Sequence, residues 1–249
     1  MKNNNNQELT NLLELMEEAA QCGFDVTSDW ILKLKIKKGF FNTLKSDLDL
    51  SKIAMQKVVG FLDYFRQTRA DEKYSLFEGP LISRVKTHHS IFKKMWRKQN
   101  PYSNEPCDYR KFPDLCGVRV TVNYLDNIYE IIDYISSNYE SCQLQECDAK
   151  LEQPNEDGYR GYHAVVKVPP ATKGFMPRVE IQVRTGYQNS WSVKTHQLTY
   201  KNEELVKKFQ KELKEYSDIL FKADQKCVEL REKIVEYLKK QKKDKNINA

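Results

Sequence analysis

Alternation of apolar and polar residues predicts a β-sheet in the middle of this 249-residue chain. The run 179–185 alternates valine or isoleucine with an acid, an amide and an arginine. A period of two places successive side chains on opposite faces of a strand, so the polar residues share one face. The runs 114–122 and 164–168 are also rich in β-branched residues, which favours strands. The polar residues of the first run are Glu180, Gln182 and Arg184.

Helical periodicity flanks these strands on both sides. The segment 31–38 alternates apolar and basic residues, which formally predicts a strand, although its length and the following Gly39 leave a helix open. The amphipathic pattern of 202–240 predicts one long helix or a helix pair, with a role in packing or oligomerisation. Apolar residues recur at three-to-four spacing over 8–20, 53–65, 127–139 and 190–200.

The order of these elements predicts an α+β fold with a mixed β-sheet flanked by helices. We expect three parts. Residues 1–78 form a helical N-terminal segment, 79–201 form the sheet core that carries the chemistry, and 202–249 form a long amphipathic helix with a frayed tail.

Composition narrows the class of protein. The net charge of +6 suits a polyanionic ligand such as a nucleotide, and it equally suits ordinary solubility. The six cysteines are scattered, with no Cys-x-x-Cys and no zinc spacing, so we expect reduced thiols. No stretch approaches the roughly 20 apolar residues of a membrane span. The N-terminus lacks an apolar signal-peptide core, so we expect a cytoplasmic protein without a membrane partner.

Two carboxylates, Asp114 and Glu180, lie on predicted strands among several cations. Magnesium usually takes one or two carboxylates and completes its shell with phosphate and water, so this set fits Mg²⁺ held with a polyphosphate. The alternative is a set of exposed ion pairs, each contributing about 0–1 kcal/mol. Walker, Rossmann, nucleophile-elbow and His-Glu-x-x-His motifs are absent from the sequence. The cations are Arg84, Lys86, Lys93, Lys94, Arg119 and Arg184.

Five motifs between residues 84 and 201 resemble the synthetase domain of the RelA/SpoT family, in its order and spacing. The resemblance implies a nucleotidyltransferase-like sheet and a stand-alone small synthetase, which transfers pyrophosphate from ATP to a nucleotide 3′-hydroxyl. The motifs are Arg84-x-Lys86 with Ser90 and Lys94, Asp114-Leu115-x-Gly117-x-Arg119, Gly158-Tyr159-Arg160 with His163, Val179 to Thr185, and Trp191 to Lys201.

The resemblance also implies roles on the donor side. Arg84 and Arg119 would sandwich the adenine of ATP, since a planar guanidinium can stack on a base. Lys86 and Lys94 would hold the phosphates of ATP. Asp114 and Glu180 would have catalytic roles. Both carboxylates would bind Mg²⁺, and Glu180 would also accept the proton of the attacking hydroxyl.

On the acceptor side, the resemblance implies that Tyr159 stacks on the acceptor base. His163 and Gln182 would lie near the phosphates or sugar of the acceptor. Two positions depart from the family, which usually has Asn or Ser where this chain has Asp157, and Ser where it has Gly161. We expect Gly161 to leave room for something larger.

The favoured acceptor is GDP or GTP, which gives the alarmone (p)ppGpp. An alternative is a toxin that pyrophosphorylates the 3′-CCA end of tRNA and is neutralised by a protein antitoxin. The basic residues of segment 33–38 would then serve the tRNA backbone, and a solvated face is the other explanation for them. A second alternative is an inactive domain that binds nucleotide or a partner. The C-terminal helix makes a homo-oligomer plausible.

Overall fold

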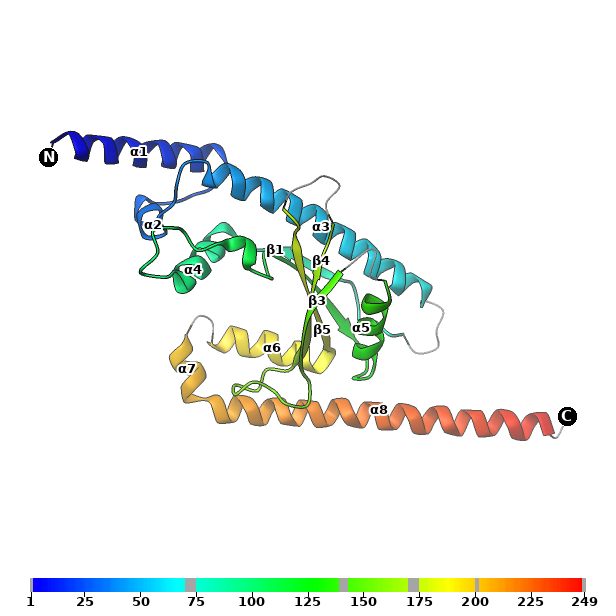
Figure 1. Cartoon of the computed structure of the whole chain (residues 1–249). Helices are drawn as coiled ribbons and strands as arrows, with labels where there is room; N and C mark the ends of the chain where they lie inside the picture. The colour runs from blue at the N-terminus through cyan, green and yellow to red at the C-terminus, as the bar shows by residue number, and fades with distance from the viewer. Residues whose placement is uncertain (1, 70–74, 139–142, 170–174, 200–201, 248–249) are drawn as a thin grey trace. The chain divides into compact units, whose positions relative to one another are not determined.

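The computed structural model describes residues 2–69, 75–138, 143–169, 175–199 and 202–247. Within these residues, helices precede, separate and follow the strands, which gives the α+β fold that the sequence predicts (Figure 1). The strands are β1 (Ile82–Val85), β2 (Cys116–Val122), β3 (Gln143–Lys150), β4 (Gly161–Lys167) and β5 (Arg178–Thr185). The helices are α1 (Lys2–Gln21), α2 (Ser28–Lys33), α3 (Phe40–Thr68), α4 (His88–Lys98), the short 3₁₀ helix η1 (Tyr109–Lys111), α5 (Asn127–Ser137), α6 (Gly186–Thr199), α7 (Glu203–Lys208) and α8 (Gln210–Ile247).

The described strands form one sheet in the order β1-β2-β5-β4-β3. Gly117 on β2 lies against Glu180 on β5, and Arg119 lies against Gln182 two residues further along both strands, so β2 and β5 run parallel. The β4–β5 hairpin is antiparallel, and the backbone N–H of Val168 donates to the carbonyl of Pro177 at the end next to the connecting segment (3.2 Å). The sheet is therefore mixed, as predicted.

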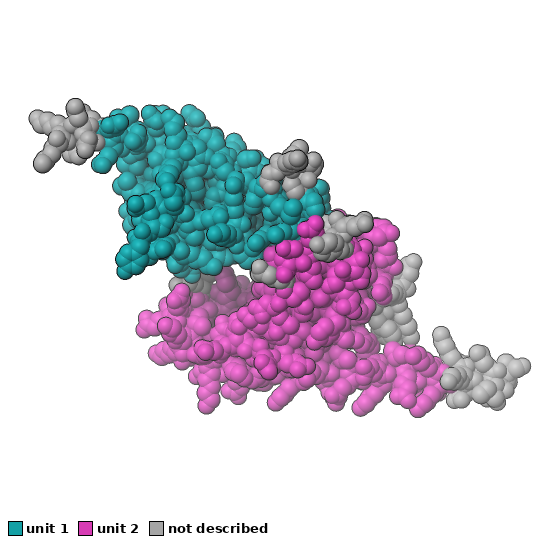
Figure 2. Space-filling model, in the orientation of Figure 1, with its two compact units in different colours: residues 1–59, 83–118, 166–180 teal, residues 60–82, 119–165, 181–249 magenta. Residues whose placement is uncertain are grey.

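The chain divides into two compact units (Figure 2). Unit 1 comprises residues 1–59, 83–118 and 166–180, and unit 2 comprises 60–82, 119–165 and 181–249. Each unit is thus assembled from three separate stretches of sequence. The expected parts 1–78, 79–201 and 202–249 were defined by sequence motifs, whereas the two units are defined by compactness. The expected division therefore stays a prediction.

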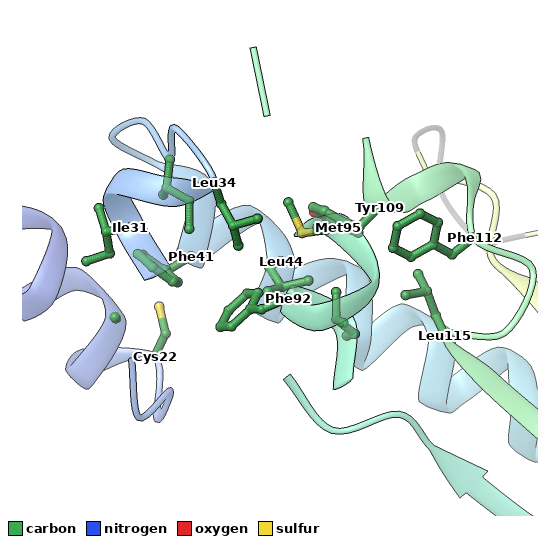
Figure 3. Packing of buried hydrophobic residues seen from close by; sticks show 13 residues of the cluster. Cys22, Ile31, Leu34, Phe41, Leu44, Phe92, Met95, Tyr109, Phe112 and Leu115 are labelled. Atoms are coloured by element: carbon green, nitrogen blue, oxygen red, sulfur yellow. The ribbon is translucent and has the colours of Figure 1, made fainter. Parts of the chain in front are cut away.

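Unit 1 is built around an apolar cluster that joins its N-terminal helices to α4 and to the segment before β2 (Figure 3). α4 contributes the buried face of an amphipathic helix. Burial of these apolar surfaces is the main source of stability for such a unit. Labelled members include Cys22, Ile31, Leu34, Phe41, Leu44, Phe92, Met95, Tyr109, Phe112 and Leu115.

The strand expected over 31–38 was wrong: residues 31–33 are the end of helix α2, and residues 34–38 form no regular element. A strand would place Leu32 and Leu34 on one face. Instead Leu32 is 65% exposed, while Ile31 and Leu34, three positions apart, are both buried. The spacing of three is helical, and the apparent alternation arose because a short segment fits both periods.

The C-terminal pattern proves to be a helix pair, α7 and α8, of which α8 runs along α6 (Figure 1). The indole N–H of Trp191 on α6 donates to the carbonyl of Leu213 on α8 (3.0 Å), which confirms a packing role for this helix. Leu230, Ile234 and Tyr237 are exposed on α8, and the expected oligomer stays a prediction. None of the described helices has the length and apolar character needed to cross a membrane.

A buried carboxyl group connects α8 to the end of β5. The side chain of Asp224 is 2% exposed and accepts a hydrogen bond from the hydroxyl of Thr185 (2.6 Å). Burial raises the pKa of Asp224 to about 6, the hydrogen bond from Thr185 opposes this, and the negative charge of Glu78 adds to it. The folded state therefore binds a proton more tightly at Asp224 than the unfolded chain does.

We expect Asp224→Asn to stabilise the protein at neutral pH. The folded pKa of about 6 lies above the unfolded value of about 3.9, so the stability that depends on this proton falls as pH rises between them. A pKa shift of this size contributes at most about 3 kcal/mol to the free energy of unfolding at low pH, and this contribution is fully lost above about pH 7. Melting curves should show a gain for the variant near pH 7.5 that disappears near pH 4.

Asp218→Asn on the same helix is the matched control. Hydrogen bonds from Lys214 and Arg160 lower the pKa of Asp218, so its contribution to stability is present at neutral pH and lost as pH falls. This variant should melt at a lower temperature than the parent near pH 7.5. A gain in stability in both variants would contradict the role of Asp224.

Candidate active site

Unit 1 brings together three of the predicted site residues: Lys86, Lys94 and Asp114. Lys86 follows β1, and its backbone N–H donates to the carbonyl of Leu115 (2.8 Å). Lys94 lies on α4, whose apolar face is buried. Lys86 Nζ lies 2.5 Å from Asp114 Oδ2 and Lys94 Nζ lies 2.7 Å from Oδ1, so each lysine pairs with one oxygen of the same carboxylate.

This ion-pair cluster is sheltered but open to solvent, since the three side chains are 20–21% exposed. Burial by itself would raise the pKa of Asp114, but the hydrogen bonds and charges of Lys86 and Lys94 outweigh it and hold the pKa below its ordinary value. Lys94 Nζ also lies 5.0 Å from the ring centroid of buried Phe112, a cation–π contact that fixes its position. The result is an ionised carboxylate with two oriented cations.

Two other predicted residues of unit 1, Glu180 and Arg84, lie on strands. Glu180 is on β5 beside Gly117, where an added Cβ would lie 3.0 Å from the backbone oxygen of Glu180. Arg84 is exposed on the edge strand β1. Among the described residues, no three histidine, cysteine or carboxylate side chains gather as a metal cluster.

In unit 2, the side-chain amide of Gln182 connects the predicted residue Arg119 to Arg184. The side-chain oxygen Oε1 of Gln182 accepts hydrogen bonds from Nη2 of Arg119 (3.3 Å) and from Nη2 of Arg184 (3.2 Å). Helix α6 supports both guanidinium groups: Arg119 also donates to Asn189 Oδ1 (3.5 Å) and Arg184 to Ser192 Oγ (2.8 Å). The two arginines are thus oriented by a shared acceptor and by one helix.

The hydroxyl of Tyr159 lies in the same network. Arg184 Nη2 donates to it (2.6 Å), and the guanidinium carbon lies 4.9 Å from the ring centroid. The hydroxyl also contacts Nε2 of His163. Because arginine can only donate, the tyrosine hydroxyl accepts from Arg184.

The loop that presents Tyr159 is anchored on α8. Gly158 has a φ of +90°, and an added Cβ would lie 2.7 Å from the Cα of Lys214 on that helix. The next arginine, Arg160, is buried and forms an ion pair with Asp218 (2.7 Å), with its guanidinium 4.1 Å from the ring centroid of Phe221. Arg160 therefore anchors the loop on α8, while its neighbour Tyr159 contacts Arg184 and His163.

Several residues of this network were missed at the level of sequence. The sequence places Arg184 on the same strand face as Glu180 and Gln182 and among the surrounding cations, but it does not indicate the contact of Arg184 with Tyr159. Nothing in the sequence pattern singled out Asn189 or Ser192. The last motif ends at Tyr200-Lys201, which lies outside the described residues.

The expectation that Gly161 leaves spare room was wrong. An added Cβ at this position would lie 2.9 Å from the hydroxyl oxygen of Tyr159. The tyrosine side chain of the same loop already fills the space.

The basic segment proposed for a tRNA backbone is largely neutralised within unit 1. Lys33 pairs with Asp29 (2.7 Å), Lys37 with Glu105, and Lys38 with Glu14 (3.0 Å). The ammonium of Lys35 donates to the carbonyl of Ser103. A phosphate backbone would have to compete with these partners, so the segment offers less positive charge than its sequence indicates.

Residues 83–205 match the family model described as "Region found in RelA / SpoT proteins". The chain therefore contains a RelA/SpoT-family domain. This region includes every residue for which the motifs implied a role.

Similarity to individual members extends beyond this region. The chain is 26% identical over 171 residues to GTP pyrophosphokinase YwaC of Bacillus subtilis, covering 66% of this chain and 80% of that protein. It is 29% identical over 159 residues to GTP pyrophosphokinase YjbM of the same organism, covering 63% and 73%. The crystal structure of small alarmone synthetase 1 from Bacillus subtilis, bound to its product pppGpp, has a TM-score of 0.65 at 26% identity, covering 78% of this chain and 98% of that one.

Gly158→Ala should lower the free energy of unfolding by about 2 kcal/mol or more, because a left-handed φ and the backbone of α8 both oppose a side chain. Urea unfolding would measure this. Gly60→Ala is the matched control, since an added Cβ on that helical residue meets nothing within 4 Å and should stabilise α3 by about 0.5–1 kcal/mol. Equal stability of Gly158→Ala and the parent would show that the loop does not rest on α8.

Proposed function

We propose that this chain is an ATP-dependent pyrophosphokinase that makes (p)ppGpp from GDP or GTP. The observation that carries the proposal is the pairing of Asp114 with Lys86 and Lys94 inside the RelA/SpoT region. It places an ionised carboxylate beside two cations, which is the charge arrangement that a metal–polyphosphate complex needs. The names of the two relatives as GTP pyrophosphokinases support the same reaction.

The donor ATP would bind through its phosphates and its base. Lys86 and Lys94 would exchange part of their contact with Asp114 for the phosphate oxygens, which carry more charge than the carboxylate. Arg84 and Arg119 would stack on the adenine. Gln182 and Asn189 already hold Arg119 by hydrogen bonds, so this guanidinium is oriented before a base arrives.

The residues present fit Mg²⁺, because carboxylate oxygens are hard ligands and the oxygens of Asp114 are ionised. Asp114 and Glu180 would hold the ion. When bound, the ion supplies positive charge that stabilises the transferring group and orients it.

Glu180 would accept the proton of the acceptor 3′-hydroxyl as that oxygen bonds to the β-phosphorus of ATP. The bond between the α–β bridging oxygen and the β-phosphorus breaks, and AMP leaves with the electron pair. Tyr159 would stack on the acceptor base, with His163 beside it. Gln182 contacts the two arginines, so its role in acceptor binding would be exerted together with them.

The acceptor should be a guanine nucleotide rather than tRNA. We expect label from the terminal phosphate of ATP to appear on GDP and GTP in the presence of Mg²⁺, with release of AMP. Deacylated tRNA, offered in a parallel reaction, should take up none, because three of the four lysines of 33–38 pair with acids of their own unit and the fourth donates to a backbone carbonyl. Label on tRNA alone would show that the chain is a translation-blocking toxin and not an alarmone synthetase. Absence of AMP with every acceptor would show that the domain is inactive.

Glu180→Gln should reduce kcat by about a thousandfold or more, which is about 4 kcal/mol of transition-state stabilisation. The amide keeps the shape of the side chain but cannot accept the proton, and it is a poorer metal ligand. The matched control is Glu229→Gln on α8, an exposed residue that pairs with Lys226 and should retain activity. Activity of Glu180→Gln within about threefold of the parent, measured as AMP release, would refute both roles of Glu180.

A further inference from the structure

The side chain of Tyr159 lies against Gly161. Gly161 is buried, and an added Cβ would lie 2.9 Å from the tyrosine hydroxyl oxygen and 3.4 Å from Cγ and Nε of Arg184. The first distance is well inside van der Waals contact, so the hydroxyl and a side chain at position 161 cannot occupy these places together. The hydroxyl of Tyr159 therefore occupies the space that a side chain at position 161 would need.

The hydroxyl is also held by two polar partners. Arg184 donates to it at 2.6 Å, and the hydroxyl contacts Nε2 of His163. Arg184 is itself fixed, being 4% exposed and bonded to Ser192 Oγ and Gln182 Oε1. We call Gly161, His163 and Arg184 the tyrosine seat.

We infer that Gly161 is a positioning residue of the proposed acceptor site, because it allows the tyrosine seat to fix the ring of Tyr159. The inference rests on the proposed function, in which the acceptor base stacks on this ring. An aromatic surface that is already ordered binds a base without the loss of side-chain freedom that a mobile ring would incur. A side chain at 161 would displace the hydroxyl, release the ring and weaken the acceptor without affecting the donor.

A double-mutant cycle tests this inference, because Tyr159→Phe removes the atom with which a side chain at 161 collides. The four proteins are the parent, Gly161→Ala, Tyr159→Phe and the double variant. Gly161→Ala should raise the KM for GDP about tenfold and leave the KM for ATP within about twofold. In the Tyr159→Phe background, the same substitution should change the KM for GDP by less than about twofold.

Gly60→Ala is the matched glycine control, since open space surrounds that position, and it should leave both KM values unchanged. Titration of GDP into each protein by calorimetry provides a readout that does not depend on turnover. The fall in GDP affinity on Gly161→Ala should be present with tyrosine at 159 and absent with phenylalanine.

An equal penalty from Gly161→Ala in both backgrounds would overturn the inference, because it would show that the glycine serves the backbone and not the hydroxyl. Loss of folding in both Gly161→Ala and the double variant would overturn it in the same way. A parent that binds GDP and transfers label while the cycle shows no coupling overturns this inference alone. A parent that neither binds GDP nor transfers label overturns the proposed function as well.

Discussion

The close approach of Gly158 to the backbone of α8 is the constraint on which unit 2 depends. An atom the size of a methyl group does not fit between them. The same helix receives the side chains of Arg160, Trp191 and Thr185, which come from the loop that carries Tyr159, from α6 and from the end of β5. A helix whose sequence pattern indicated packing or oligomerisation therefore supports the elements that carry Tyr159 and Arg184.

Local periodicity made much of the fold predictable. The alternation in β5 is a property of the strand itself, so the sequence alone assigns Glu180, Gln182 and Arg184 to one face. The ends of helices and the segment 31–38 were less certain, since a short apolar and basic run satisfies two periods. The outcome there depended on which residues the core of unit 1 could bury, which no local pattern contains.

The residue types of the site were predictable, but the partners of each residue were not. Lys86 and Lys94 belong to one motif and Asp114 to another, and the ion pairs bring them together. By contrast, the contact of Arg184 with Tyr159 requires α6 to lie where it does, which is a non-local fact. Gly161 shows the same limit: a missing side chain indicates space only when no neighbour fills it, and here the neighbour is two residues away.

The shared oxygen of Gln182 has a thermodynamic consequence. Arg119, which we propose to stack on the base of ATP, and Arg184, which donates to the hydroxyl of Tyr159, both donate to this one atom. In the proposed function, a ligand that draws one guanidinium away from the amide would alter the hydrogen bonding of the other, so the binding of donor and acceptor would be coupled. Linkage requires the effect to be mutual: whatever ATP does to the affinity for the guanine nucleotide, the guanine nucleotide does to the affinity for ATP by the same factor.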